Sequence, residues 1–399
     1  MKKKIVFVGI SGGVDSAVSA ALLQKEGHEV VGVFIKTWHP DFLVCNEEEE
    51  RHDAMRVAAH LNIPFLTFNF EDVYKKEVAD YMIHEYKMGR TPNPDVMCNK
   101  EVKFGAFLKK ALAMGADYVA TGHYARLERA SRKLQVLKVC KGKKLYKLDE
   151  LYKLLTGCDS TKDQSYFLWT LKQEQLRKIL FPVGHLKKTE VRKLAKKFHL
   201  PVAEKKDSQG ICFLGDIDLK GFLKHYIKPK KGKVYNAEGK EIGFHEGAVF
   251  NTLGERHGFT ITKKNPNDGA YYVVGKDINK NILFVSQKSP LLVSARSCLA
   301  ERGSKLKFTS PRPSPCQGEG VVIRLEDVNW ISENYPLETK SYTCQVRYHG
   351  EFLPCKIKAE GPERSRRAEV IFEKPVLVAS GQSCVIYDGD VCLGGGVVM

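Results

Sequence analysis

Blocks of apolar residues alternate with amphipathic stretches along the first half of the chain. Compact apolar runs predict buried strands at residues 4–10, 29–38, 64–70 and 117–125. Between these runs, apolar residues at helical spacing predict helices at residues 15–27, 47–63 and 103–116. Repeated strand–helix–strand units form a parallel sheet with helices on both faces, and ligands bind outside the carboxyl ends of its strands.

The pattern changes after about residue 222. Short strands broken by glycine and lysine follow at 228–247, and alternating runs at 346–360 and 368–399 are typical of a small barrel or sandwich. Residues 303–320 are rich in proline, serine and glycine, and we expect a flexible insertion without chemistry there. The predicted domains are 1–222, 223–285 and 286–399.

The chain of 399 residues has 64 Lys and Arg against 47 Asp and Glu, a formal net charge of +17. This surplus indicates either a polyanionic partner or scattered surface lysines, and charge alone does not choose between them. The eleven cysteines form no CxxC pair or Cys/His cluster, which argues against a disulfide framework and a structural zinc site. No apolar segment is long enough to span a membrane. We expect a soluble protein of the reducing cytoplasm.

The stretch GISGGVDS, residues 9–16, stands where the first strand ends and the first helix begins. Its adjacent glycines allow the backbone to approach a ligand, and successive N–H groups at a helix N-terminus favour an anion. Ser11 and Ser16 add hydroxyl donors, and Asp15 can hold Mg²⁺. Neither GK[ST] nor GxGxxG is present. A plain strand-to-helix turn is the alternative, but the complete SGGVDS favours a phosphate-binding loop.

Two cysteines stand in loops suited to chemistry. Asp95 and Cys98 lie in GRTPNPDVMCNKEVKFG, an extended proline-containing loop just before the predicted helix, and Cys212 lies in DSQGICFLG at the end of the α/β region. A thiol near a helix N-terminus can have a lowered pKa and act as a nucleophile. A lone cysteine is more often an apolar filler. The second candidate, in a polar glycine-bearing loop, weakens that alternative for both.

SGGVDS resembles the loop of the ATP pyrophosphatases, which cleave ATP between the α and β phosphates, but the loop alone does not choose among them. A series of motifs over nearly the whole chain is similar, in order, to the tRNA-specific 2-thiouridylase family. These motifs are SGGVDS, GRTPNPDVMCN, TGHYAR, KDQSYFL, DSQGICFLG, VNWIS and GQSCVIYDGDVCLGGG. The resemblance implies ATP-dependent replacement of the C2 oxygen of the wobble uridine by sulfur in tRNAs for lysine, glutamate and glutamine. It also implies an α/β fold, with a Rossmann-like parallel-sheet N-terminal domain, a small central domain and a C-terminal β-barrel that binds tRNA.

The same resemblance implies roles for individual residues. ATP, with Mg²⁺ near Asp15, would be held by Gly9, Ile10, Ser11, Gly12, Gly13, Val14, Asp15, Ser16, Ile35 and Gly122. Cys212 would carry a persulfide received from a sulfur-relay protein, and its terminal sulfur would replace the C2 oxygen directly or after release as hydrosulfide. Cys98 would release that sulfur and leave a transient Cys98–Cys212 disulfide. Asp95 would act as an acid or base.

Contacts with tRNA are implied for a further set: Asn93, Pro94, Asp95, His123, Lys162, Asp163, Gln164, Arg347, Tyr348 and Gln382. Taken singly, each has an ordinary alternative, such as a satisfied loop histidine or a solvated lysine, and only the ordered motif set favours RNA. The target base must leave the anticodon loop, which costs little in single-stranded RNA. We expect one basic run to form a solvated helix face that also attracts tRNA. It consists of Lys187, Lys188, Arg192, Lys193, Lys196 and Lys197. We expect a monomer.

The chain departs from the family pattern in several places. Ile35 stands where methionine is usual, and residues 133–155 and 303–320 look like additions at the surface. The glycine-rich end at 394–399 is expected to close a strand and not to bind nucleotide. Two other functions stay open: an ATP-dependent ligase or amidotransferase that uses the same loop, and a tRNA-binding protein without catalysis.

Overall fold

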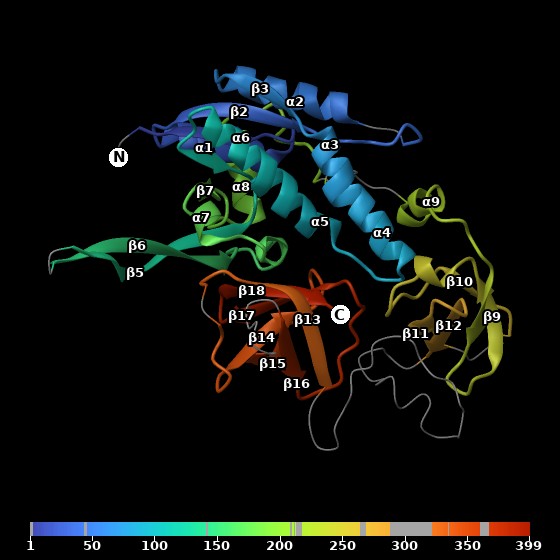
Figure 1. The fold of residues 1–399 in the computed structure, drawn as a ribbon. Helices are drawn as coiled ribbons and strands as arrows, with labels where there is room; N and C mark the ends of the chain where they lie inside the picture. Colours follow the sequence, from blue (N-terminus) through green and yellow to red (C-terminus); the bar gives the residue numbers. More distant parts are fainter. Residues whose placement is uncertain are drawn as a thin grey trace.

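The computed structural model describes most of the chain and shows three structural parts (Figure 1). The described residues are 3–43, 46–140, 143–207, 210, 212, 218–263, 269–287, 321–333, 335–359 and 367–399. The predicted insertion at 303–320 lies outside them. The α/β fold class is confirmed, while the exact domain boundaries at 1–222, 223–285 and 286–399 stay predictions.

The first part is a parallel sheet with the strand order β3-β2-β1-β4-β7. Its strands are β1 (Ile5–Gly9), β2 (Glu29–Lys36), β3 (Phe65–Asn69), β4 (Tyr118–Ala120) and β7 (Ile179–Leu180). The predicted strands match β1 to β4, although β4 is shorter than predicted because the chain turns away at Thr121. The order changes direction at β1, so a crevice forms between the carboxyl ends of β1 and β4.

Helices cover both faces of this sheet. On one face lie α1 (Val14–Lys25), α2 (Glu47–His60) and α8 (Lys188–Lys197). On the other lie α3 (Glu71–Tyr74), η1 (Lys75–Asp80), α4 (Tyr81–Lys87), α5 (Pro94–Met97), η2 (Cys98–Phe107) and α6 (Leu108–Ala113). The alternation of β1 explains the two cores, since Val6 and Val8 pack toward α1 and Phe7 packs toward η2. Shorter helices are η3 (Ser165–Leu168), α7 (Gln173–Leu176) and α9 (Leu219–Lys224).

The helix that carries the first cysteine begins earlier than the sequence predicted. Asn93 is its N-cap, and the Asn93 side chain accepts a hydrogen bond from the Val96 N–H at 3.2 Å. Pro94 occupies the first helical position, where its missing N–H costs no hydrogen bond. Asp95 and Cys98 therefore lie inside the first turns of a continuous α5–η2–α6 stretch, and not in a loop before it.

The central part is a five-stranded sheet with the order β10-β9-β8-β12-β11. Its elements are β8 (Gly232–Tyr235), β9 (Glu241–His245), η4 (Ala248–Phe250), β10 (Phe259–Ile261), β11 (Tyr272–Asp277) and β12 (Ile282–Ser286). The C-terminal strands are β13 (Val321–Trp330), β14 (Ser341–Gln345), β15 (Leu353–Ala359), β16 (Ala368–Phe372), β17 (Ser383–Asp388) and β18 (Val391–Val398). Because β13 pairs with both β16 and β18, the sheet closes into a barrel, and the glycine-rich end completes it as predicted.

A hairpin joins the first part to the barrel. It consists of β5 (Ala125–Cys140) and β6 (Lys143–Thr156), so the segment 133–155 is a paired extension of the chain. At its base, Leu154 and Leu155 pair with Cys392 and Val391 of β18. In Figure 1 the barrel lies below the first part, beside the base of this hairpin. This arrangement brings a barrel loop to the crevice of the first part.

Candidate active site

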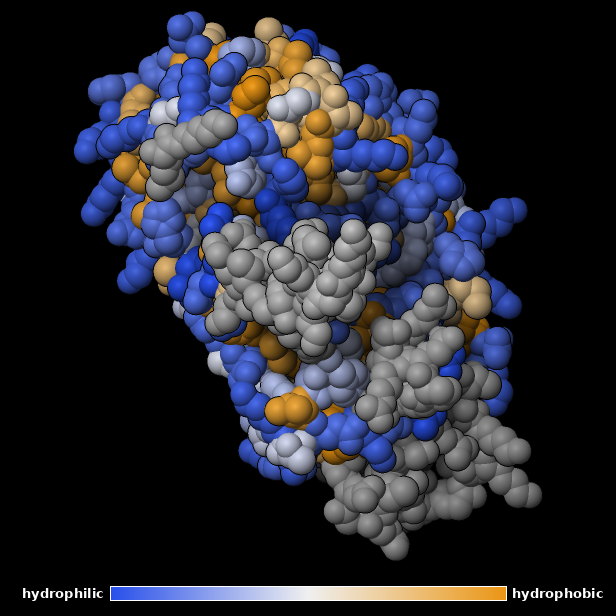
Figure 2. Space-filling view, turned by 60° about the vertical axis from the view of Figure 1, so that its left-hand side comes forward, coloured by the Kyte–Doolittle hydropathy of each residue, from blue (hydrophilic) through white to orange (hydrophobic). Residues whose placement is uncertain are grey.

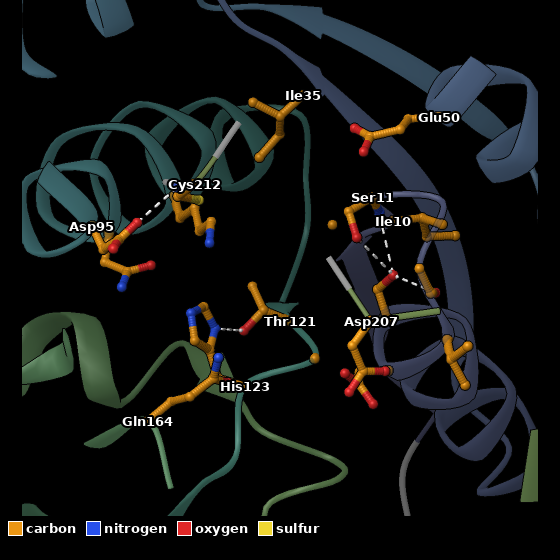
Figure 3. Close-up of a pocket in the computed structure, with 18 of the residues that line it drawn as sticks. Ile10, Ser11, Ile35, Glu50, Asp95, Thr121, His123, Gln164, Asp207 and Cys212 are labelled. Atoms are coloured by element: carbon orange, nitrogen blue, oxygen red, sulfur yellow. Dashed lines mark hydrogen bonds between the residues drawn. The ribbon is translucent and has the colours of Figure 1, made fainter. Parts of the chain in front are cut away.

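A cavity of about 840 Å³ opens at the carboxyl ends of β1, β2 and β4. It lies against the loop 9–16, and Tyr348 and His349 from the barrel line it as well. Figure 3 shows Cys212 and Asp95 on one side of it, Ser11 and Asp207 on the opposite side, and His123 between them. The cavity therefore joins the predicted nucleotide loop to the predicted cysteine site. The surface seen in Figure 2 is mostly hydrophilic, with separate hydrophobic patches.

The loop 9–16 is held in shape by its two serines. The Ser11 N–H donates to Ser16 Oγ at 3.2 Å, and the Ser16 hydroxyl donates to the Gly13 carbonyl at 3.1 Å. Gly13 is the N-cap of α1 and supplies no side chain to cap it. The first amides of α1 consequently keep their capacity to bind an anion at the cavity.

Glycine is required in this loop for packing as well as for approach of a ligand. Gly12 has φ +73°, and a Cβ there would lie 2.5 Å from the Glu50 carbonyl oxygen. A Cβ on Gly122, which follows β4, would lie 2.7 Å from the Ser16 N atom. The turn after β4 therefore abuts the N-terminus of α1 and closes the crevice from that side.

Charged side chains cluster beside the loop. Lys188 Nζ lies 2.7 Å from Asp15 Oδ1 and 2.9 Å from Asp207 Oδ1, and Lys162 Nζ lies 2.8 Å from Asp207 Oδ2. The Tyr124 hydroxyl also donates to Asp15 Oδ1 at 2.7 Å. Burial by itself would raise the pKa of the Asp207 carboxyl, but Lys162 and Lys188 hold that pKa well below its ordinary value. Each carboxylate thus has an ammonium group beside it, and Lys162 and Lys188 line the cavity.

The two cysteines meet across the cavity wall. Cys98 Sγ lies 3.5 Å from Cys212 Sγ, and neither cysteine is in a disulfide. Cys98 is fully buried, whereas Cys212 is partly accessible and lines the cavity. The Cys212 N–H donates to Asp95 Oδ1 at 2.8 Å, and the Tyr74 hydroxyl donates to the Cys212 carbonyl at 2.8 Å. The loop of Cys212 is therefore fixed to the helix of Cys98.

The electrostatics of the pair are unequal. The hydrogen bond with Cys98 lowers the pKa of the Cys212 thiol below its usual value, burial opposes this shift, and Lys103 supports it. Burial, followed by the interaction with Cys212, raises the pKa of the Cys98 thiol. Burial acts against the charged form of Lys103, but the two sulfurs and Asp95 raise its pKa above the ordinary value. Cys212 is consequently the cysteine of the pair that loses its proton more readily, and it has an ammonium group beside it.

His123 and Gln164 form the floor of the cavity. The His123 ring Nδ1 lies 2.7 Å from Thr121 Oγ1, and burial, with a smaller effect of Lys103, lowers the pKa of its imidazole well below the usual value. Gln164 Oε1 accepts the Tyr124 N–H at 3.0 Å and so fixes the turn after His123. A neutral imidazole at this position can donate or accept a hydrogen bond without adding charge.

Comparison with known proteins relates this site to one family. Family models match residues 4–216 (tRNA methyl transferase HUP domain), 220–287 (tRNA methyl transferase PRC-barrel domain) and 321–398 (Aminomethyltransferase beta-barrel domain). The tRNA-specific 2-thiouridylase MnmA of Geobacillus thermodenitrificans is 41% identical over 98% of this chain and 94% of its own length. That of Bacillus pumilus is 42% identical, with the same two coverages.

The chain belongs to the tRNA-specific 2-thiouridylase family. The family predicted from the motifs is thereby confirmed. Among solved structures, the U34-tRNA thiolase NcsA of Methanococcus maripaludis covers 57% of this chain and 67% of its own, at 15% identity and a TM-score of 0.32. That likeness is too distant to bear on the site.

In this 2-thiouridylase family member, most of the predicted site residues line one cavity. They are Gly9, Ile10, Ser11, Gly13, Val14, Asp15, Ser16, Ile35, Asp95, Gly122, His123, Lys162, Gln164, Cys212 and Tyr348. The others lie behind the wall or away from it: Gly12, Asn93, Pro94, Cys98, Asp163, Arg347 and Gln382. Asp163 accepts the Gly157 and Ser165 N–H groups, so its contacts are internal. Their roles in binding ATP or tRNA stay predictions.

Several cavity residues were not predicted as site residues, and four of them belong to the charged and hydrogen-bonded groups described above: Lys103, Tyr124, Lys188 and Asp207. Lys103 and Asp207 stand inside the quoted cysteine motifs, and Tyr124 stands inside TGHYAR. Their position in these motifs could have indicated them as site residues. Lys188 was placed on a solvated helix face, which is wrong for this residue because its ammonium group is turned toward Asp15 and Asp207. Arg192 also pairs with Asp207. The remaining lysines of the run are exposed as predicted: Lys187, Lys193, Lys196 and Lys197.

The described residues offer neither a metal cluster nor a membrane-spanning helix. No group of three His, Cys, Asp or Glu side chains suited to a metal ion occurs among them. Within the same part of the chain, no helix is both long and apolar enough to cross a membrane.

Proposed function

We propose that this chain uses ATP to replace the C2 oxygen of the wobble uridine of tRNA by sulfur. The observation that carries the proposal is the 3.5 Å approach of Cys98 Sγ to Cys212 Sγ at a cavity whose opposite wall is the SGGVDS loop. An ATP-dependent thiolation needs a nucleotide site and a sulfur carrier that face the same substrate atom. The C2 oxygen of uridine is a poor leaving group. Adenylation by ATP attaches an AMP group to this oxygen, so that the oxygen can depart as part of AMP.

The residues around the loop fit a nucleotide. The uncapped N-terminus of α1 and the ammonium groups of Lys162 and Lys188 suit the phosphates. The buried side chain of Ile35, near the end of β2, offers an apolar contact for the base. Mg²⁺ would arrive with ATP near Asp15, and an ion that reached this carboxylate would compete with Lys188 for it.

The thiols supply the sulfur in this proposal. Cys212 carries a persulfide delivered by a donor protein, and Lys103 favours the anionic form of its sulfur. The terminal sulfur bonds to C2 of the activated uridine, and AMP departs with the former C2 oxygen. Cys98 Sγ bonds to Cys212 Sγ as the persulfide S–S bond breaks, so Cys98 is oxidised, the transferred sulfur is reduced, and Cys212 Sγ keeps its oxidation state. An external thiol then reduces the Cys98–Cys212 disulfide.

The predicted acid or base, Asp95, has a clear positioning contact. Its carboxylate accepts the Cys212 N–H, and burial, only partly offset by that hydrogen bond, raises the pKa of the Asp95 carboxyl. A carboxyl group with a raised pKa exchanges protons more readily near neutral pH. We therefore propose that Asp95 both holds the Cys212 loop and moves a proton at the cavity.

The target base enters from the side of the barrel. Tyr348, beside Phe167 at a ring-centroid distance of 4.3 Å, offers an aromatic face, and His123 offers a hydrogen bond at the floor. The formal net charge of +17 suits a polyanionic RNA. The choice of lysine, glutamate and glutamine tRNAs, a monomeric state and a cytoplasmic location stay predictions.

Mass analysis of nucleosides tests the function. Unmodified tRNA is incubated with the protein, ATP and a persulfide source, and a 2-thiouridine product that requires ATP is expected. A ligase or amidotransferase would consume ATP without needing the cysteines, and a non-catalytic binder would release no tRNA-dependent AMP. Either of these results, without thiolated uridine, would show that the proposed function is wrong.

A further inference from the structure

The C-terminal barrel binds the backbone of Thr91, which lies just before the helix α5 that leads to Cys98. The Thr91 N–H donates to the Ser380 carbonyl at 2.7 Å, and Gln382 Nε2 donates to the Thr91 carbonyl at 3.1 Å. Both backbone polar groups of Thr91 are therefore bonded to a single barrel turn. Thr91 is 6% exposed, so these bonds are shielded from water.

The turn that makes these contacts is shaped for close approach. Gly381 has φ +90°, a conformation that favours glycine, and a Cβ there would lie 2.9 Å from the Thr91 N atom. The central part adds a third contact, because Thr252 Oγ1 lies 3.2 Å from Thr91 Oγ1. All three parts of the molecule consequently meet at Thr91.

The segment after Thr91 is short and stiff. Pro92 and Pro94 fix their own backbone torsions, and Asn93 between them caps the helix through the Val96 N–H. Asp95 then binds the Cys212 N–H, and Cys98 faces Cys212 one helical turn later. Because few freely rotating backbone bonds separate Thr91 from Cys98, a displacement of Thr91 should also shift Cys98 Sγ relative to Cys212 Sγ.

We propose that the barrel turn Ser380–Gln382 positions the Cys98 helix so that the two thiols stay aligned. The barrel would then have two roles, to align the two thiols through Thr91 and to bind tRNA. Gln382 is in this view a positioning residue, because its side chain donates to the Thr91 carbonyl. Only the expected effect on the rate of thiolation rests on the proposed function, since the alignment of the thiols is measurable without ATP or tRNA.

The test is the equilibrium between the Cys98–Cys212 dithiol and glutathione disulfide, which oxidises the pair and yields two glutathione thiols. Gln382→Ala removes the donor to Thr91, and Gly381→Ala inserts a methyl group against its backbone. We expect each variant to lower the equilibrium constant for disulfide formation about tenfold, which is a shift of about 30 mV in reduction potential. In the thiolation assay, kcat should fall while the KM for tRNA changes little in Gly381→Ala.

Asn329→Ala is the matched control. Asn329 Nδ2 also ties the barrel to the first part, through the Trp169 and Leu171 carbonyls at 2.7 and 3.0 Å, but it does not contact Thr91. This variant should lose thermal stability and keep the wild-type thiol equilibrium. An unchanged equilibrium in both folded test variants would overturn the proposal, as would an equal shift in Asn329→Ala. Weaker tRNA binding by Gln382→Ala with an unchanged equilibrium would instead assign Gln382 to RNA.

Discussion

Cys98 Sγ lies 3.5 Å from Cys212 Sγ, although 114 positions of sequence separate the two residues. The pair is asymmetric, because Cys98 is fully buried and Cys212 reaches the cavity. Of the two, Cys212 is the one that a sulfur donor or a substrate can reach from the cavity. Cys98 lies on the buried side of Cys212, from which its sulfur can attack Cys212 Sγ. In the proposed reaction, this geometry suits Cys212 to the role of sulfur carrier and Cys98 to that of resolving thiol.

Replacement of Cys212 by serine should separate ATP chemistry from sulfur transfer. Adenylation of uridine needs no thiol, so pyrophosphate should still form with tRNA and ATP, while 2-thiouridine should fall about a thousandfold or more. Nucleoside mass analysis and a pyrophosphate assay measure the two steps. Cys158→Ser is the control, since Cys158 is an exposed thiol that does not line the cavity. Normal thiolation by Cys212→Ser would refute the carrier role.

Removal of the ammonium group beside the sulfurs should raise the pKa of Cys212. Since Cys98 and Lys103 both favour its thiolate, alkylation of Cys212 by iodoacetamide should reach half its maximal rate at a lower pH than for an ordinary cysteine. Lys103→Met should move this midpoint upward by about one pH unit and slow alkylation at neutral pH. Lys100→Met is the control, because the exposed Lys100 pairs with Glu101 at 3.0 Å. An unmoved midpoint in Lys103→Met would exclude the electrostatic role.

Loss of the half-buried Lys188 of α8 should weaken ATP binding. Lys188→Met removes a cation beside the loop. Among the described side chains this leaves the Tyr124 hydroxyl as the partner of Asp15, so phosphate meets less attraction and more repulsion. We expect the Kd for ATP to rise about tenfold to a hundredfold, measured by calorimetry. Lys193→Met, an exposed lysine on the same helix, should bind ATP like the wild type. Equal affinities for both variants would place the phosphates elsewhere.

A methyl group on Gly12 should damage the loop more than one on Gly27. Both glycines have positive φ, +73° and +88°, so alanine at either position carries a backbone cost of about 1–2 kcal/mol. Only at position 12 would the Cβ also meet a neighbour, the Glu50 carbonyl oxygen at 2.5 Å, whereas position 27 is open. We expect Gly12→Ala to lose about 1–3 kcal/mol more unfolding free energy than Gly27→Ala, together with ATP binding. Chemical denaturation checks this, and equal losses would contradict the packing argument.

The local pattern of the sequence was sufficient for the sheet and for the loop at its edge. Apolar runs predict β1 to β4 because buried parallel strands must be apolar on both faces. The helical stretch from Glu71 to Lys87 was not predicted. Its buried face is built from residues such as Tyr74 and Met82, and packing against the sheet stabilises it more than local propensity does.

The sequence by itself determined the family and singled out the loop 9–16 and the two cysteines, because each stands in a contiguous motif. Only the tertiary structure decided that Cys98 is buried behind Cys212, that Lys188 is turned toward Asp15, and that Thr91 is held by the barrel. These relationships join segments far apart in the chain. They depend on how helices and domains pack, and no local periodicity of apolar and polar residues records such contacts.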